Sequence, residues 1–504
     1  MGAGSAASGA GGTGPELGVP FAPDVGKTAL LIGQSGRRAH VDYVLGTASM
    51  PAGGSVYAEL YSGKLLSFEQ EAFVDYLARE APGALVEVGL SWKDNRVNAG
   101  YCDLADAACL ARGGAVDPEL DIVAGKYDPA LQSFAALLKS NTQLKFLLRV
   151  DYEVSPNLHC RPSDETDCPA YVNAFAHIKK TLQQAGASNV AFVFHPTRGW
   201  AKQLYPGPEL TDWIAFSVFN HDLCLPTPEG TNGGCTPGAH LDQNLARDLA
   251  WAAEQGKPIL IAESTVQQPS SASAAGFNEY LSRLLELVNL YPQVRGLTYI
   301  NMKWAGGWIY GEDWTSGAFG NVDARLSRFP ETRAYFCAQL ALGRFVGLGG
   351  AMLGCDQAVP TFERPLPTDL DAPAYERLIA LGNNRCVRMA AGSDAAGSSL
   401  SPSECAELSG NGEARLHVAE APGGTHLFGD VSWLCWSAEG ERVVERACAD
   451  DPAQRFRLEE LQTTPRYREL RIESYDGRCL ASAGNDAPFA LLPCGDAPEQ
   501  TFRL

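Results

Sequence analysis

Eight short apolar runs, separated by stretches with helical periodicity, are the feature that most restricts how this chain can fold. The intervening stretches repeat apolar residues every three to four positions, as amphipathic helices do, over 68–80, 171–186, 241–256 and 274–291. Strands that alternate with helices in this way predict an α/β fold, a (β/α)8 TIM barrel. A doubly wound open sheet is the alternative, although no glycine-rich phosphate loop follows the first run. The runs cover 29–33, 55–60, 84–91, 145–150, 189–195, 213–219, 258–263 and 296–301.

The fourth run is apolar at its start and charged at its end, as expected of a buried strand that emerges into a site. Because side chains alternate along a strand, Arg149, Asp151 and Glu153 are predicted to share one face. Three ionisable groups on an inward face are costly unless they are paired or used. One interpretation is a structural ion pair that fills the interior, and the other is a catalytic carboxylate held by its neighbours.

Active sites of such barrels form at the C-terminal ends of the strands. In this chain those ends are rich in polar and aromatic residues. Two carboxylates stand out among them, Glu153 after the fourth run and Glu263 at the end of the seventh. The other candidates for substrate contacts at the strand ends are Arg149, Asp151, Gln34, Trp92, His195, Asn220, Trp304 and Trp308.

With two glutamates after strands four and seven, the chain resembles the clan of retaining glycoside hydrolases, and more closely glycoside hydrolase family 26, known mainly for β-mannanases. The most specific matching segments are RVDYE (149–153) and KPILIAE (257–263), taken as a pair. Further matches are Gly33-Gln34, 90–92 (LSW) and 301–304. The resemblance extends over about 27–345 and implies a retaining glycosidase.

This resemblance assigns Glu153 as the acid/base and Glu263 as the nucleophile. Retaining cleavage needs one protonated carboxyl and one carboxylate, about 5 Å apart. Asp151 is a rival acid, but Glu153 lies nearer the strand end. For Glu263 the alternative is a carboxylate at a helix start. Arg149 is the first expected hydrogen-bond donor to Glu263, and Tyr299 and Asn301 are two others.

Tryptophans near the strand ends are expected to stack on sugar rings, Trp92 and Trp304 first and Trp308 with them. A single tryptophan is more often a core residue, so the expectation rests on the group, which also includes Trp200. His195 is predicted to be a hydrogen-bonding residue of the barrel wall rather than a base.

Three positions depart from the family pattern. Tyr152 replaces a His before the acid, Phe219 stands where the family places a Tyr that contacts the nucleophile, and Lys93 replaces a His after Trp92. These departures support an alternative from another class, a catalytically inactive carbohydrate-binding protein. A transglycosylase that uses the same two glutamates is a third possibility.

The bulk composition limits the partners of the protein. The chain has 504 residues and a net charge of −19, which argues against nucleic acid or an anionic membrane as a partner. No apolar run is long enough to span a bilayer. A neutral polysaccharide substrate is compatible with this charge. We expect a monomer that needs no cofactor and no metal.

Fourteen cysteines fall into local couples, which indicates disulfides formed in an oxidising compartment, and hence secretion. Zinc binding is the alternative, but no Cys-x-x-Cys motif supports it. Residues 1–14 are mostly Gly, Ala, Ser and Thr and lack the features of a signal peptide, so we expect any signal to have been removed before this numbering. The couples are Cys102 with Cys109, Cys160 with Cys168, Cys224 with Cys235, Cys337 with Cys355, Cys386 with Cys405, Cys435 with Cys448 and Cys479 with Cys494.

The last part of the chain loses the helical period and repeats itself. A short motif around Cys386, Cys435 and Cys479 recurs three times, and Gln-x-Phe closes the last two repeats at Phe456 and Phe502. This region resembles ricin-B-type β-trefoil lectins, which implies an all-β trefoil and a carbohydrate ligand. The expected domains are a flexible tail (1–26), a glycoside hydrolase barrel (27–355), a linker (356–370) and the trefoil (371–504).

Overall fold

A computed structural model describes most of the first part of the chain and the strands of the second. The described residues are 20–34, 36–61, 65–66, 68–92, 118–155, 168–228, 230, 234–304 and 317–357, and then 374–375, 379–380, 385–388, 399–403, 416–421, 425–429, 434–447, 451–463, 468–483 and 487–503.

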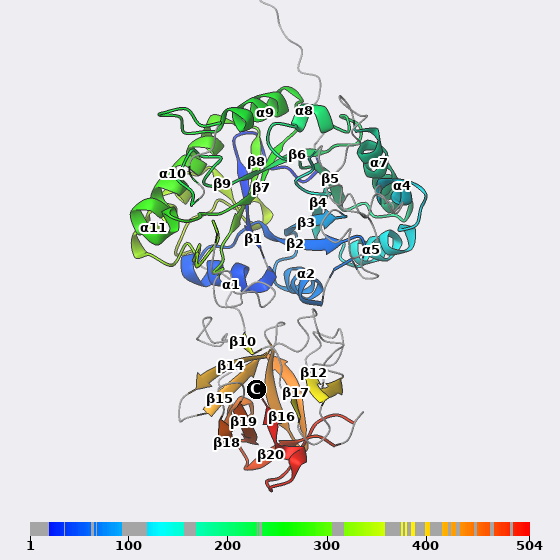
Figure 1. Cartoon of the computed structure of the whole chain (residues 1–504), viewed down its shortest axis with the longest axis vertical. Helices are drawn as coiled ribbons and strands as arrows, with labels where there is room; N and C mark the ends of the chain where they lie inside the picture. Colours follow the sequence, from blue (N-terminus) through cyan, green and yellow to red (C-terminus); the bar gives the residue numbers. More distant parts are fainter. Residues whose placement is uncertain are drawn as a thin grey trace, which may run out of the picture.

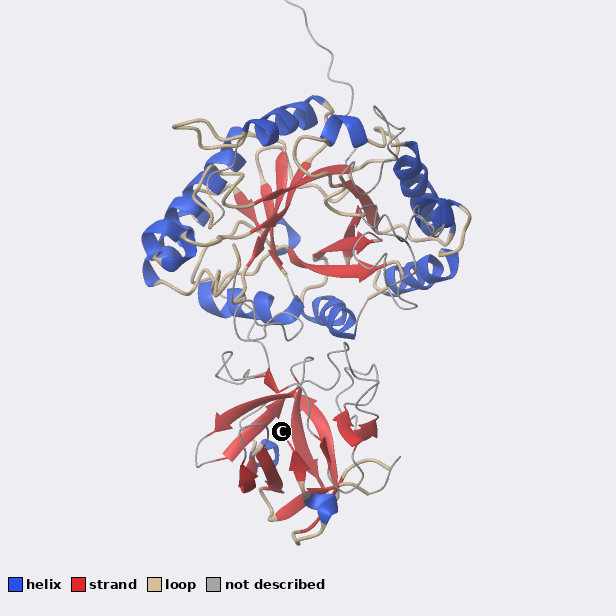
Figure 2. Cartoon of the chain, viewed as in Figure 1, coloured by secondary structure: helices blue, strands red, loops and turns tan. Residues whose placement is uncertain are grey.

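Eight parallel strands close into a barrel, with β1 paired to both β2 and β8 (Figures 1 and 2). Each of the eight predicted runs forms one strand, so the predicted barrel is confirmed and the open sheet is wrong. A ninth strand of two residues, β9 (Phe345–Val346), adds to β1. The barrel strands are β1 (Thr28–Gly33), β2 (Gly53–Glu59), β3 (Leu85–Ser91), β4 (Lys145–Val150), β5 (Val190–Phe194), β6 (Trp213–Val218), β7 (Ile259–Ser264) and β8 (Val294–Ile300).

Helices surround the barrel (Figure 2). α2 has the predicted bounds, and the other three predicted helices begin or end within two residues of theirs. Asp242 caps α9 by accepting from the backbone N–H of Asn244 and Leu245. No described helix is long and apolar enough to cross a membrane. The helices are α1 (Gly36–Thr47), α2 (Phe68–Glu80), α4 (Pro118–Val123), α5 (Asp128–Ser140), α7 (Pro169–Gln184), α8 (Ala201–Leu204), α9 (Gln243–Glu254), α10 (Ala274–Leu290) and α11 (Pro330–Leu340), with 3-10 turns at Ser270–Ala272 and Leu348–Gly350.

The alternation of side chains along β4 shows how the barrel is filled. Phe146 and Leu148 point outward into the large core beneath the helices. Leu147 points inward and packs in a smaller core with Trp213 and Leu260. Arg149 is the next inward residue along the strand, so the barrel interior changes from apolar to charged toward the C-terminal ends of the strands.

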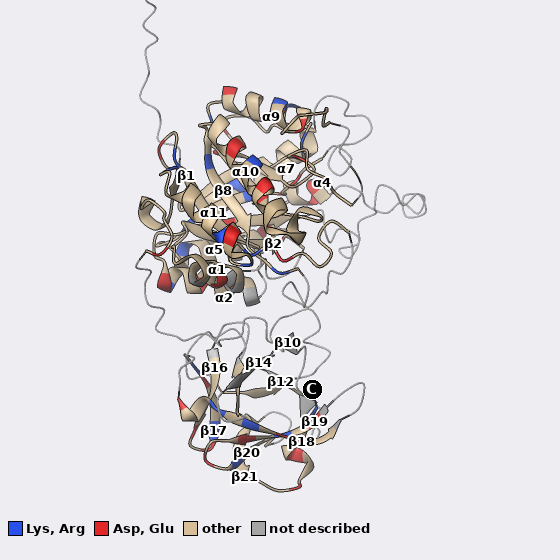
Figure 3. Cartoon of the chain, turned by 90° about the vertical axis from the view of Figure 1, so that its left-hand side faces the viewer, with Lys and Arg blue, Asp and Glu red and all other residues tan. Residues whose placement is uncertain are grey.

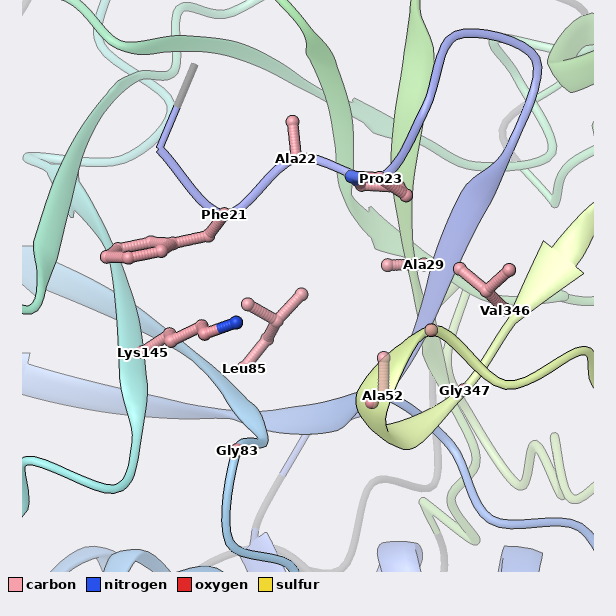
Figure 4. Close-up of a pocket in the computed structure, with 12 residues that line it drawn as sticks. Phe21, Ala22, Pro23, Ala29, Ala52, Gly83, Leu85, Lys145, Val346 and Gly347 are labelled. Carbon is pink, nitrogen blue, oxygen red and sulfur yellow. The ribbon is translucent and has the colours of Figure 1, made fainter. Parts of the chain in front are cut away.

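Residues 20–23 pack against the N-terminal end of the barrel, and the assignment of residues up to 26 to a flexible tail is wrong for this segment. The carbonyl of Pro20 accepts a hydrogen bond from the Trp213 indole (3.0 Å), and Phe21 packs on the inner core. Phe21 also lines a pocket of about 290 Å³ with Leu85, Lys145 and Val346 (Figure 4). The physical reason is apolar burial, because Phe21 covers the barrel end that its strands leave open. The pocket lies at the opposite end from Glu153 and Glu263.

The first residues of the predicted linker also belong to the barrel domain. The backbone N–H groups of Asp356 and Gln357 donate to carbonyls at the end of α1, at 3.0 Å each, and Asp356 pairs with Arg333. The predicted boundary at 355 therefore falls two residues early. The rest of the linker, 358–370, lies outside the described residues.

The second part of the chain forms an all-β sheet with 13 described strands. The two Gln-x-Phe endings have the same structure: a 3-10 turn ends at Gln454 or Gln500, and Phe456 or Phe502 follows fully buried. Because these residues are core residues, they support the repeat rather than a ligand site. The strands are β10 (Ala374–Tyr375), β11 (Ile379–Ala380), β12 (Arg385–Arg388), β13 (Ser401–Ser403), β14 (Leu416–Ala421), β15 (Thr425–Gly429), β16 (Leu434–Glu439), β17 (Arg442–Ala447), β18 (Phe456–Thr463), β19 (Arg468–Ser474), β20 (Arg478–Ala481), β21 (Ala490–Pro493) and β22 (Phe502–Arg503), and the 3-10 turns are Pro452–Gln454 and Pro498–Gln500.

Three of the predicted disulfides are present among the described residues: Cys224–Cys235, Cys337–Cys355 and Cys479–Cys494. Cys168, Cys386 and Cys435 are also disulfide-bonded. Their predicted partners Cys160, Cys405 and Cys448 lie outside the described residues.

The first predicted couple joins Cys102 and Cys109. Both Cys102 and Cys109 fall within 93–117, a segment outside the described residues. A disulfide between Cys102 and Cys109 therefore stays a prediction from the sequence.

Candidate active site

Polar side chains from seven of the eight barrel strands meet inside the C-terminal half of the barrel. Elsewhere in the barrel domain, charged residues lie largely on the outer helices and loops (Figure 3). The inward-facing residues that contact one another are Tyr57 (β2), Glu87 (β3), Arg149 (β4), His195 (β5), Ser217 (β6), Glu263 (β7) and Thr298 (β8).

Arg149 is the centre of this cluster and is fully buried. Its Nε lies 2.8 Å from Glu87 Oε1, and its Nη1 lies 2.6 Å from Glu263 Oε1. The guanidinium also lies over the rings of Tyr57 and Tyr152, 5.3 and 4.9 Å from their centroids. One arginine thus joins two carboxylates on strands that are far apart in the sequence.

Gly89 makes room for this arrangement. It is the register partner of both Tyr57 and Arg149 in the neighbouring strands. A Cβ at this position would come within 2.8 Å of Arg149 Nη2 and 2.9 Å of the Tyr57 ring. A larger residue here would therefore displace the arginine.

The charge of Arg149 is balanced mainly by Glu87. Burial raises the pKa of Glu87 to about 7, although Arg149 and a hydrogen bond from Thr298 act in the opposite direction. Burial alone would lower the pKa of Arg149, but Glu87, Tyr57 and Glu263 together raise it well above its usual value. Arg149 is thus the permanent cation of the site, and Glu87 is the group that gains or loses a proton near neutral pH.

The carboxylate of Glu263 is anchored through one oxygen. Oε1 accepts from Arg149 and from the hydroxyl of Tyr57 (2.9 Å). Within the described part of the chain, Oε2 accepts no hydrogen bond, and the side chain keeps 10% of its surface exposed. Glu263 lies inside β7, so the helix-start interpretation is wrong. The other two expected donors bond elsewhere, Tyr299 to the carbonyl of Ala324 and Asn301 to Asp42 and the carbonyl of Ala39.

The family pattern places a tyrosine hydroxyl at the position of Phe219, and in this structure Tyr57 supplies a hydroxyl to Glu263 instead. Phe219 packs edge-on against Phe319 (5.7 Å between centroids), whereas Tyr57 reaches Glu263 from β2. Withdrawal of the Tyr57 hydroxyl from water, followed by the charge of Glu263, raises its pKa well above the usual range. Tyr57 therefore keeps its proton at neutral pH and donates it in a hydrogen bond to Glu263.

Glu153 lies in a turn after β4 rather than on the strand. Both Asp151 and Glu153 have left-handed backbone conformations, with φ of 51° and 55°, so strand alternation ends at Val150. The turn brings the partly exposed Glu153 to the hydroxyl of Ser217, which donates to its Oε1 (2.7 Å). Left-handed glutamates are uncommon, and such conformations persist where the surroundings determine them.

Asp151 is fully buried, and its Oδ1 accepts from the backbone N–H of Trp92 (3.0 Å). Its surroundings are those of a residue that joins the ends of β3 and β4. Trp92 is also buried, and its indole N–H donates to Glu119 (3.0 Å). Neither Asp151 nor Trp92 presents a surface to a sugar ring.

The remaining predicted contacts divide between structural positions and the opening of the barrel. Asn220 is buried, and its amide joins the loops after β6 and β7 through Gln267 and Ser270. Trp304 is 5% exposed and packs on Phe319, with 4.5 Å between ring centroids. Gln34 is partly exposed at the end of β1, while Trp308 and Lys93 lie outside the described residues. Trp200 is more open, with 42% of its surface exposed after β5.

Sequence reasoning missed Tyr57, Glu87 and Ser217. Glu87 had a usable signal, because a lone charge within the apolar run 84–91 calls for a buried partner. Tyr57 and Ser217 had none, since a tyrosine or serine in a strand is ordinary. Among the described residues, no group of three or more His, Cys, Asp or Glu side chains could hold a metal ion.

Replacing Tyr57 with phenylalanine is expected to lower any activity that depends on Glu263 roughly tenfold or more, because a hydrogen bond to a charged group is lost. The matched control is Tyr280→Phe, which removes a buried hydroxyl bound to the carbonyl of Val218. An equal loss in the control would rule out a specific role for Tyr57.

Replacing Glu87 with glutamine should change how stability depends on pH. The folded-state pKa of Glu87 is raised from 4.5 to about 7, so its contribution is full below pH 4.5 and is lost as pH rises through 7. At 1.36 kcal/mol per pH unit, wild type should lose about 3 kcal/mol relative to the variant between pH 4.5 and 8. Urea unfolding at both pH values measures the difference. A constant difference would contradict the assignment.

No family model matches the chain. The beta-1,3-xylanase TXYA of a Vibrio species is 22% identical over 239 residues, which is 41% of this chain and 48% of that protein, so the match spans about half the relative's length. Among solved structures, the Bacillus subtilis mannanase BCman (10% identity, TM-score 0.40) aligns with 65% of this chain and 88% of its own. The designed three-fold symmetric protein ThreeFoil (14% identity, TM-score 0.23) aligns with 26% of this chain and 95% of its own.

Proposed function

We propose that this protein is a secreted glycoside hydrolase that cleaves a β-linked polysaccharide internally and with retention. The observation that carries the proposal is Glu263, whose Oε1 is held by Arg149 and Tyr57 while Oε2 accepts no hydrogen bond from any described residue. An anchored carboxylate with one open oxygen has the form that a nucleophile requires. Glu153, at the same end of the barrel, serves as the acid/base.

The spacing of the two glutamates supports retention. Ser217 on β6 is the register partner of Glu263 on β7, and neighbouring strands lie about 4.8 Å apart. The Ser217 hydroxyl in turn lies 2.7 Å from Glu153 Oε1. The two glutamates are therefore held at neighbouring positions of one barrel end, and the retention that we propose requires their carboxyl groups to lie about 5 Å apart.

In the first half-reaction, Oε2 of Glu263 forms a bond to the anomeric carbon as the glycosidic bond breaks. Glu153 gives its proton to the departing oxygen. Arg149 and Tyr57 hold Oε1 of Glu263 in place before the attack. In the second half, a water oxygen attacks the same carbon, its proton passes to Glu153, and the bond to Glu263 breaks.

The substrate class is proposed from the relative and from the second domain. The Vibrio relative is named as a β-1,3-xylanase, so β-1,3-xylan is the first polymer to test. The repeated Gln-x-Phe units support a ricin-B-type trefoil that keeps the monomeric enzyme on its polymer by raising the effective concentration of substrate. The disulfides support an oxidising compartment.

The test is a product screen against β-1,3-xylan, β-mannan, mixed-linkage glucan and galactan. We expect oligosaccharides from one polymer, with the β-anomer as the first product seen by proton NMR. An initial α-anomer would disprove retention. Products longer than the substrate would indicate transglycosylation. If every polymer stays intact while one is retained on a column by the protein, the carbohydrate-binding alternative is correct.

A further inference from the structure

A continuous chain of hydrogen bonds connects the two proposed catalytic glutamates. It passes through His195 and Ser217, neither of which the proposed chemistry uses. The distances are 2.6 Å from Glu263 Oε1 to Arg149 Nη1, 3.3 Å from there to His195 Nδ1, 3.2 Å from His195 Nε2 to Ser217 Oγ, and 2.7 Å from Ser217 Oγ to Glu153 Oε1.

Arg149 fixes the direction of this chain. A guanidinium can only donate, so Nδ1 of His195 must accept, and the ring proton must then sit on Nε2. Nε2–H donates to the oxygen of Ser217, whose own proton is left for Glu153. The positive charge of Arg149 thus polarises His195 and Ser217 toward the Glu153 carboxylate.

We propose that His195 and Ser217 are positioning residues that transmit the charge of Arg149 to Glu153, so that Glu153 holds its proton less tightly once Glu263 is glycosylated. This inference rests on the proposed function. In the free enzyme the Glu263 carboxylate offsets Arg149 together with Glu87. In the glycosyl-enzyme Glu263 is a neutral ester, so more of the arginine's field reaches Glu153 through the two residues.

This switch matches the two roles of Glu153. The first half-reaction needs Glu153 to give a proton to the leaving oxygen, and the second needs it to take one from water. No net proton moves along the chain of hydrogen bonds. Among the described residues, the charged and titratable groups around Glu153 and its partners are Asp151 and Tyr152 beside it, Tyr57 on β2, Glu87 on β3, Arg149 on β4, His195 on β5 and Glu263 on β7.

The decisive variant is Ser217→Ala, assayed with a dinitrophenyl glycoside of the sugar found in the product screen. This leaving group needs no protonation, so kcat reports the second half-reaction and kcat/KM the first. We expect kcat and KM to fall together by roughly ten- to a hundredfold, the cost of a lost hydrogen bond to a charged group. The acidic limb of the pH profile of kcat should move to higher pH. The value of kcat/KM should stay within about threefold of wild type.

Three companion variants separate this role from a structural one. Ser217→Thr keeps the hydroxyl and should restore kcat. Ser264→Ala removes a buried hydroxyl from β7 that donates to the carbonyl of Thr298 (2.8 Å), and should leave the pH profile unchanged. His195→Leu combined with Ser217→Ala should cost no more than Ser217→Ala alone, because both break one chain. Additive losses, or an equal fall in kcat and kcat/KM, would overturn the proposal.

The pH profiles are repeated in the Glu87→Gln background, because Glu87 titrates near neutral pH. A shift of the acidic limb caused by Ser217→Ala should persist there. If the shift disappears, Glu87 rather than Glu153 is the group that responds.

Nitrogen-15 NMR tests the chain of hydrogen bonds without any substrate, because it shows which ring nitrogen of His195 carries the proton. The His195→Leu variant assigns the signal. We expect a neutral ring with the proton on Nε2 from pH 5 to 8. A proton on Nδ1, or a charged imidazolium, overturns the inference even if the protein is an active glycosidase. The expected tautomer together with no activity on any polymer would instead refute the proposed function, and the switch with it.

Discussion

Replacing Glu263 with alanine is expected to reduce polysaccharide cleavage by at least about four orders of magnitude while the barrel stays folded. Removal of a nucleophile that forms a covalent intermediate has an effect of this size in other enzymes. Circular dichroism and polymer retention by the second domain should match wild type, because the Glu263 side chain hydrogen-bonds only Arg149 and Tyr57 among the described residues.

Azide distinguishes the roles of the two glutamates in this experiment. With an activated aryl glycoside, the Glu263→Ala variant should be rescued by azide and give an α-glycosyl azide, because azide enters from the face that Glu263 occupied. Glu153→Ala should give the β-glycosyl azide, since its nucleophile is intact. The opposite pattern would exchange the two assignments. If azide rescues neither variant, neither glutamate has its proposed role.

Replacing Arg149 with methionine is expected to destabilise the barrel by about 3–5 kcal/mol at pH 8. The substitution leaves Glu87 and Glu263 buried without their shared cation, and removing one partner of a buried ion pair has a cost of this size. The loss should be smaller at pH 5, because Glu87, with its pKa raised to about 7 by burial, is then protonated. Urea unfolding at the two pH values measures both effects.

Lys126→Met is the matched control for Arg149→Met. Lys126 pairs with Asp121 at 2.8 Å, but both side chains are exposed, by 54% and 39%. Exposed pairs contribute less than about 1 kcal/mol. If Arg149→Met is as stable as this control at pH 8, the arginine does not hold the two carboxylates, and the proposed nucleophile loses its anchor.

The barrel could be predicted from sequence because its signals are local. Each strand is a short apolar run, each predicted helix shows three-to-four spacing, and glycines such as Gly186 and Gly256 follow helix ends with φ of 87° and 68°. Residues 20–23 could not be separated from the tail, because a single phenylalanine gives no periodic signal. Only the folded barrel offers Phe21 an apolar end to cover.

The sequence by itself determined the eight-stranded barrel, the all-β second domain and the candidate glutamates, since these follow from periodicity, repeats and short motifs. Only the tertiary structure decided which groups surround them. The sequence placed Arg149 inside the barrel and named it as a donor to Glu263, which the structure confirms. It could not pair Arg149 with Glu87, because partners across a barrel are set by strand register and tilt. In the same way, closure of the barrel brought Tyr57 to Glu263 and Ser217 to Glu153, contacts that join residues 206 and 64 positions apart.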